Sequence, residues 1–158
     1  MKNYEDYYAR ITRGVNAPAL NIANKFLTIL FYVSYPVLLL INLKNPDLWK
    51  LFLVPAVSFI ILSLGRHFIN EPRPYETWHI DPLIRKNKKG SSMPSRHIFS
   101  SAVIAMSWLY VYPLIGIVFL IAAGISSWIR VVGGVHYPKD VIAGYVIGIL
   151  SGLFLWLL

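Results

Sequence analysis

The sequence contains no cysteine, which excludes a disulfide framework and a metal site built from thiolates. Charged residues are scarce as well: they make up 14% of the 158 residues, whereas soluble domains carry about 25%. Hydrophobic residues account for 56%. This composition argues against an ordinary soluble enzyme and indicates one lipid-embedded domain, residues 1–158.

Acidic residues are also few, because seven Asp and Glu are outnumbered by fifteen Lys and Arg, a formal net charge of +8. A basic chain can bind nucleic acid. Here, however, the basic residues border apolar runs and do not line a soluble face. We therefore expect anionic lipid or phosphate as the partner, and no nucleic acid. No secretory signal is recognisable near the start, where charges mix with aromatics.

Long apolar runs predict an all-α integral membrane bundle of about five transmembrane helices. The first is residues 26–43, the second 51–69 and the last 138–158. Residues 1–20 mix basic and aromatic side chains, which fits an amphipathic segment lying in the membrane interface; a disordered tail is the alternative.

Residues 98–129 carry no charge, and these 32 residues exceed the roughly 20 that one helix needs to cross a bilayer. Pro113, preceded by the aromatic Tyr112, is a natural point of reversal. We therefore predict a hairpin of two short helices, residues 94–112 and 113–129. In the last helix, three glycines recur every fourth residue, and we expect them to pack within the chain more than in a dimer: Gly144, Gly148 and Gly152.

The hairpin would bring the polar clusters at 66–74, 94–97 and 130–140 to one membrane face. Guanidinium groups gathered there repel one another unless an anion lies between them, and they match the oxygens of phosphate in geometry. Ser95 and the first backbone N–H groups of the following helix add donors. The cationic and imidazole side chains that would converge are Arg66, Arg73, Arg96, Arg130, His97 and His136.

A histidine and a carboxylate lie four residues apart before the last helix. Pro138 suits a first helical turn, which places Asp140 in that turn and within reach of His136. An imidazole backed by a carboxylate is held in one tautomer and is more nucleophilic. With a second histidine, one could attack phosphorus and the other protonate the departing oxygen. The alternative is an interfacial loop in which Arg130 meets headgroups and His136 caps a turn.

Three motifs carry a family resemblance. In order and spacing they resemble the signature motifs of the type 2 phosphatidic acid phosphatase superfamily, which includes lipid phosphate phosphatases and vanadium haloperoxidases. The resemblance covers residues 66–140. Within the superfamily, the chain resembles the small bacterial membrane members. The motifs are Arg66-x6-Arg73-Pro74, Pro94-Ser95-Arg96-His97 and Arg130-x5-His136-x3-Asp140.

The resemblance implies that His136 is the nucleophile and forms a phosphohistidine, and that Asp140 orients it. It implies that His97 protonates the leaving group and then activates water. The family needs no metal, and we expect no cofactor, because four guanidiniums supply the charge that a divalent cation otherwise would. The residues that would hold the phosphate are Arg66, Arg73, Ser95, Arg96 and Arg130.

Three positions depart from the usual motifs. Arg66 replaces a lysine and keeps its charge with a different fork geometry. Arg96 replaces a glycine, and its side chain either binds phosphate or faces lipid headgroups. Ile129 replaces a serine, which removes one hydroxyl donor. Members of the family also commonly have three spans before the first motif, whereas we count two, so residues 1–20 would stand in for the third.

These inferences predict a multi-pass cell-membrane enzyme that hydrolyses a lipid phosphomonoester or diphosphate. The resemblance offers phosphatidic acid, phosphatidylglycerol phosphate and undecaprenyl diphosphate as substrates, and the sequence does not choose among them. An apolar-walled opening between helices would let the lipid tail stay in the bilayer. A lipid phosphotransferase using the same histidine and a non-catalytic lipid-phosphate-binding membrane protein are the alternatives.

Other polar residues have simpler interpretations. We expect His67 to lie at the interface and His79 to pack within the long loop at 70–96. The face with the motifs carries 13 of the 15 Lys and Arg, which slightly favours the cytoplasm, although many bacterial relatives act on the outer side. The sequence leaves the membrane side and the oligomeric state open. The basic loop residues expected to face headgroups are Arg85, Lys86, Lys88 and Lys89.

Overall fold

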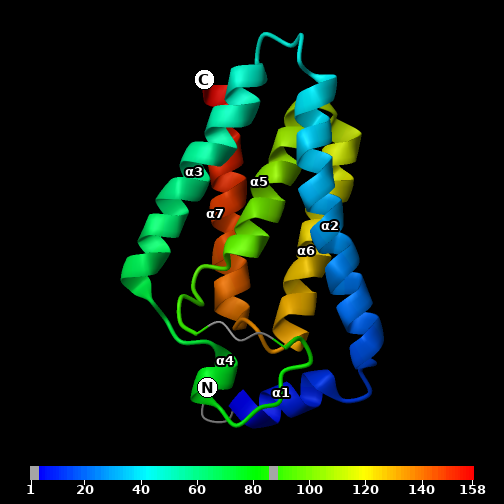
Figure 1. The fold of residues 1–158 in the computed structure, drawn as a ribbon, viewed down its shortest axis with the longest axis vertical. Coiled ribbons are helices and arrows are strands. Elements are labelled where there is room, and N and C mark those ends of the chain that lie inside the picture. Colours follow the sequence, from blue (N-terminus) through cyan, green and yellow to red (C-terminus); the bar gives the residue numbers. More distant parts are fainter. Residues whose placement is uncertain (1–3, 86–88) are drawn as a thin grey trace.

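The computed structural model describes residues 4–85 and 89–158, and all regular structure in these two ranges is helical. The helices pack into a bundle in which α5 lies centrally, against α7 and α6 (Figure 1). Their bounds are α1 (Tyr4–Thr12), α2 (Ala17–Ile41), α3 (Leu48–Ile69), α4 (Pro74–Thr77), α5 (Arg96–Val111), α6 (Pro113–Val132) and α7 (Pro138–Leu157).

Four helical segments are long and apolar enough to cross a membrane: α2, the segment Leu48–Thr77 that contains α3, and the two helices α6 and α7. The all-α membrane architecture is thus confirmed, with four candidate spans. The one predicted span that is not among these four is the third in the chain, α5. It has only 16 residues, fewer than the roughly 20 that a bilayer requires. Most of its residues between Ile98 and Trp108 are buried against neighbouring helices, so little of its length would need to face lipid.

The chain reverses between α5 and α6 as the hairpin prediction requires. Tyr112 ends one helix and precedes the other, and Pro113 occupies the first turn of α6. The two helices approach closely there, because a Cβ on Gly116 would lie 2.2 Å from the Cα of Leu109. The starts of α5 and α7 and the ends of α3 and α6 consequently lie at one end of the bundle (Figure 1).

The N-terminal segment differs from the prediction in two respects. Asn16 caps α2, with its Oδ1 accepting the N–H of Ala19 at 3.0 Å, so α2 begins at Ala17 and not near residue 26. The remaining helix, α1, has nine residues, too few to cross a bilayer, and so does not supply a third span before the first motif.

Helix α1 lies across the end of the bundle that carries the motifs (Figure 1). Tyr4 is buried there, with its ring 5.0 Å from that of Tyr137 and 6.0 Å from that of Trp78. The hydroxyl of Tyr8 accepts the N–H of Leu83 at 3.3 Å. The alternative of a disordered tail is therefore wrong for α1, which covers the loops of the site.

The glycine stripe of α7 packs within the chain, as predicted, and its partner is α5. A Cβ on Gly144 would lie 2.5 Å from the carbonyl oxygen of Ser95, and one on Gly152 would lie 2.3 Å from the Cβ of Met106. Small residues therefore let the two backbones approach closely. This contact positions the start of α5, with its motif, against the start of α7.

Gly148→Ala is expected to destabilise the bundle, because the new Cβ would lie 2.7 Å from the Cβ of Ala102 and 2.8 Å from the carbonyl oxygen of Phe99. Overpacking of this kind costs about 1–3 kcal/mol. Thermal unfolding in detergent should show a lower midpoint. Gly124→Ala in α6 is the matched control, since its Cβ would meet nothing within 4 Å. Equal midpoints for the two variants would contradict the close α5–α7 contact.

Candidate active site

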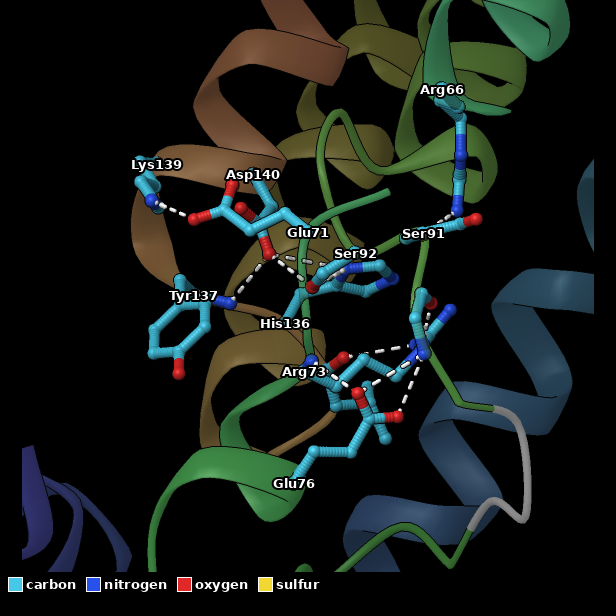
Figure 2. A network of polar contacts seen from close by, with 12 residues as sticks. Arg66, Glu71, Arg73, Glu76, Ser91, Ser92, His136, Tyr137, Lys139 and Asp140 are labelled. Atoms are coloured by element: carbon cyan, nitrogen blue, oxygen red, sulfur yellow. Dashed lines mark hydrogen bonds and ion pairs between the residues drawn. The ribbon is translucent and has the colours of Figure 1, made fainter. Parts of the chain in front are cut away.

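His136, Asp140 and Ser92 form a buried polar cluster at the start of α7 (Figure 2). The Nδ1 of His136 lies 3.5 Å from Oδ2 of Asp140 and 3.4 Å from Oγ of Ser92. Ser92 donates its hydroxyl to the same Asp140 oxygen at 2.5 Å. The predicted proximity of His136 and Asp140 is confirmed, and their catalytic roles stay a prediction.

The geometry of Asp140 follows from the local sequence. Pro138 begins α7 and places Asp140 in the first turn, where its Oδ2 accepts the backbone N–H of Tyr137 at 3.0 Å. The side chain is 0% exposed, so its charge depends on these donors and on the imidazole. Because Nδ1 faces the carboxylate, Nε2 is the ring nitrogen available to a substrate.

Burial lowers the pKa of His136 to about 4, and the charges of Arg73 and Arg130 act in the same direction. The hydrogen bond and charge of Asp140 oppose them and are weaker than the desolvation. At neutral pH the imidazole is therefore uncharged. An uncharged imidazole has the lone pair that attack on phosphorus requires.

This lowered pKa predicts how stability depends on pH. Unfolded His136 titrates near its ordinary value of 6.5, so between about pH 4 and 6.5 the unfolded chain binds the proton and the folded chain does not. The free energy of unfolding should fall as the pH drops through this window, by at most about 1.4 kcal/mol per pH unit. Thermal unfolding of wild type and His136→Asn from pH 7 to 4.5 measures it. The variant should lose part of the pH dependence, and parallel curves would contradict the lowered pKa.

Ser92 was missed by the sequence interpretation. Its backbone N–H donates to the carbonyl of Glu71 at 2.8 Å, and the N–H of Ser91 donates to Oδ1 of Asn70 at 3.2 Å. These bonds hold the loop before α5 against the end of α3. The only sequence signal was the polar run Gly90-Ser91-Ser92, which does not distinguish a site residue from a turn.

Arg73 connects the first motif to the third. Its Nη1 donates to the carbonyl of Val135 at 3.0 Å, and its Nε donates to the carbonyl of Gly90 at 3.3 Å. Glu76, which the sequence interpretation also missed, accepts the N–H of Arg73 at 3.0 Å and that of Gly90 at 2.8 Å (Figure 2). Arg73 is thus buried beside the residue that precedes His136.

Arg66 and Arg130 are buried as well. Arg66, at the end of α3, donates through Nη2 to the carbonyl of Ser91 (Figure 2). Arg130, at the end of α6, is 3% exposed, and within the described ranges its Nε and Nη1 donate no hydrogen bond. A buried guanidinium with free donors carries a large desolvation cost unless an anion completes it. Its position therefore suits a phosphate.

The second motif lies at the start of α5. The backbone N–H of Ser95 donates to the carbonyl of Asp140 at 2.8 Å, and its buried Oγ makes no hydrogen bond to any residue that the structure describes. Arg96 and His97 line a cavity of about 350 Å³ among α2, α3 and α5. The predicted residues thus divide into a buried group around His136 and a pair at this cavity.

The remaining polar candidates lie at the surface. The side chain of His67 is exposed and contacts the ring of Phe68. The expected packing of His79 within the loop is wrong, because its side chain is exposed and its backbone N–H donates to Oε1 of Glu5 on α1 at 2.9 Å. Arg85 and Lys89 are exposed, and their contact with headgroups stays a prediction. Lys86 and Lys88 lie outside the described residues. Over residues 4–85 and 89–158, no group of three His, Asp or Glu could hold a metal ion.

Comparisons with known proteins agree on one family. The model of the PAP2 superfamily matches residues 47–158. An undecaprenyl-diphosphatase of Sulfolobus acidocaldarius is 31% identical over 121 residues, which cover 74% of this chain and 59% of the relative. The chain therefore spans less than two thirds of the length of that relative.

Two crystal structures share the fold. LpxE from Aquifex aeolicus superposes with a TM-score of 0.79 at 22% identity, over 97% of this chain and 94% of that one. A transmembrane PAP2-type phosphatidylglycerolphosphate phosphatase from Bacillus subtilis gives a TM-score of 0.74 at 21% identity, over 99% and 86% of the two chains. At these identities the likeness establishes the fold alone.

Proposed function

Because the chain belongs to the PAP2 superfamily of membrane phosphatases, we propose that it hydrolyses a lipid phosphomonoester or the terminal phosphate of a lipid diphosphate through a phosphohistidine. It does so as one multi-pass membrane domain, residues 1–158. The observation that carries the proposal is the buried, uncharged imidazole of His136, held by Asp140 and Ser92.

The first step forms the covalent intermediate. Nε2 of His136 attacks the phosphorus, a bond forms between nitrogen and phosphorus, and the bond from phosphorus to the departing oxygen breaks. Asp140 stabilises the positive charge that develops on the imidazole, and Ser92 keeps that carboxylate oriented. His97 donates a proton to the departing oxygen.

The second step releases phosphate. His97, now a base, takes a proton from a water molecule that attacks the phosphorus, and the phosphorus–nitrogen bond breaks. Arg66, Arg73 and Arg130 stabilise the charge spread over the phosphate oxygens, with Ser95 as a further donor. Buried guanidiniums are effective here because little water screens them.

A second cavity offers a place for the lipid tail. It has a volume of about 370 Å³, and its lining is predominantly apolar. It shares with the cavity at His97 the residues Phe31, Tyr32, Phe59, Ser100 and Ile104. The two cavities follow α2, α3 and α5, so a hydrocarbon chain lying along them stays among membrane helices while its phosphate reaches the motif end.

A phosphate-release screen tests the proposal. The purified full chain is supplied with phosphatidic acid, phosphatidylglycerol phosphate or undecaprenyl diphosphate in mixed micelles, with and without EDTA and without any acceptor. We expect release of inorganic phosphate from at least one lipid, at a rate that EDTA leaves unchanged. Transfer only when an acceptor alcohol is added would indicate a phosphotransferase, and a chain inert on every lipid would indicate a binding protein.

A further inference from the structure

Arg96 differs from the other three arginines of the motifs. Arg66, Arg73 and Arg130 are buried, with exposed fractions of 5%, 4% and 3%. Arg96 is exposed, and its guanidinium carbon lies 5.5 Å from the centre of the Phe59 ring on α3. This cation–π contact holds its charge outside the buried group that surrounds His136.

The position of Arg96 relates it to the leaving group of the reaction. It lines the same cavity as His97, the proposed proton donor to the departing oxygen, and Phe59 lines both that cavity and the apolar one. Its backbone follows Ser95, whose N–H is bound to the carbonyl of Asp140. The side chain of Arg96 thus begins beside the reacting centre and lies where the tail side of a substrate would be.

We propose that Arg96 binds the phosphate that remains on the lipid when a lipid diphosphate is cleaved, and so selects lipid diphosphates over lipid monophosphates. The inference rests on the proposed function and names its substrate class. The related motifs usually carry glycine at this position, which has no side chain for this task. The selectivity would therefore be a property of this chain.

The chemistry of the two leaving groups explains the selection. In a diphosphate, Nε2 of His136 bonds to the terminal phosphorus, and the electron pair of the broken bond stays on the bridging oxygen of a lipid monophosphate. That product is an anion whose second pKa is about 6, so a fixed positive charge stabilises it without full protonation. In a monophosphate the departing oxygen becomes an alcohol. It needs the proton of His97 and has no charge for Arg96 to bind.

The experiment compares two substrates with the same tail, farnesyl diphosphate and farnesyl monophosphate, on the purified full chain in micelles. The measured quantity is kcat/KM for phosphate release. Arg96→Gln should lower it about 10- to 100-fold on the diphosphate, the effect expected for losing a charged hydrogen bond. The loss on the monophosphate should stay within about threefold. Arg96→Lys should recover part of the diphosphate activity, because it restores the charge without the planar fork.

Arg13→Gln is the matched control, since it removes an exposed arginine beyond α1 at the same end of the bundle. It should leave the ratio of the two kcat/KM values unchanged. Equal losses on both substrates in Arg96→Gln, or no loss on either, would overturn the selection while leaving the proposed function intact. A wild type that releases phosphate from the monophosphate but not from the diphosphate would also overturn the selection. A wild type that releases phosphate from neither substrate and from no lipid of the phosphate-release screen, or undiminished release by His136→Ala, would overturn the proposed function itself.

Discussion

Replacing His136 by alanine is expected to abolish phosphate release, with a fall in kcat of about 10⁴-fold or more, as for loss of the nucleophile in other covalent catalysts. The variant retains the buried arginines but lacks the proposed nucleophilic nitrogen, Nε2 of His136. Initial rates on a lipid phosphate measure the loss. Reactions with a lipid phosphate labelled on its terminal phosphate, stopped with detergent at alkaline pH where a phosphohistidine is stable, should leave label on the wild-type protein and none on His136→Ala.

His67→Ala is the control for this experiment. His67 lies at the same end of the bundle, near the end of α3, but its side chain is exposed and contacts Phe68. It should retain wild-type turnover and labelling. If His136→Ala kept a measurable covalent label, the nucleophile would have to be another residue, and His97 would be the first to test.

Arg130→Met is expected to lower the activity without lowering the stability. Loss of one preorganised donor to a developing charge commonly costs 10²- to 10³-fold, so kcat/KM should fall by about 10³-fold. Without an anion, however, the variant should unfold at the same or a higher temperature than the wild type. The reason is that two buried nitrogens of Arg130, Nε and Nη1, have no hydrogen-bond acceptor among residues 4–85 and 89–158.

The role of Arg130 can also be measured by how much a bound anion stabilises the wild type and Arg130→Met. A phosphate analogue such as vanadate at 100 times its dissociation constant should stabilise the wild type by about 2.7 kcal/mol and the variant much less. Ser126→Ala, one turn earlier on the same helix and also buried, controls for repacking of α6. A large drop in the midpoint of Arg130→Met without anion would contradict this account, because Arg130 would then be a structural support.

The sequence predicted well what depends on local rules. Pro113 and Pro138 each began a helix as expected, because a first helical turn needs no N–H from its residue. The uncharged run before Arg130 was too long for one helix, so the hairpin followed from bilayer thickness. The four-residue spacing placed Asp140 beside His136, because the first helical turn that Pro138 begins brings the two side chains together.

The errors have two sources, a local helix cap at Asn16 and contacts between distant segments. The start of α2 was placed too late because apolar content was used and the Asn16 cap was overlooked. Helix α5 is short, as the hairpin prediction implied, but which helices enclose it, namely α6, α7 and α3, depends on contacts that no count of apolar residues indicates. Ser92 and Glu76 came into the site only through bonds between the loop before α5 and the ends of other elements.

By itself, the sequence determined that this is a helical membrane protein with the side chains of its three motifs at one end, because hydropathy and proline positions act within single segments. Only the tertiary structure decided how those side chains differ. Burial leaves His136 uncharged and, among residues 4–85 and 89–158, leaves Nε and Nη1 of Arg130 without an acceptor, whereas Arg96 stays exposed against Phe59. Such differences depend on how much water and how many donors neighbouring helices leave around each group, and no residue's own sequence context specifies that.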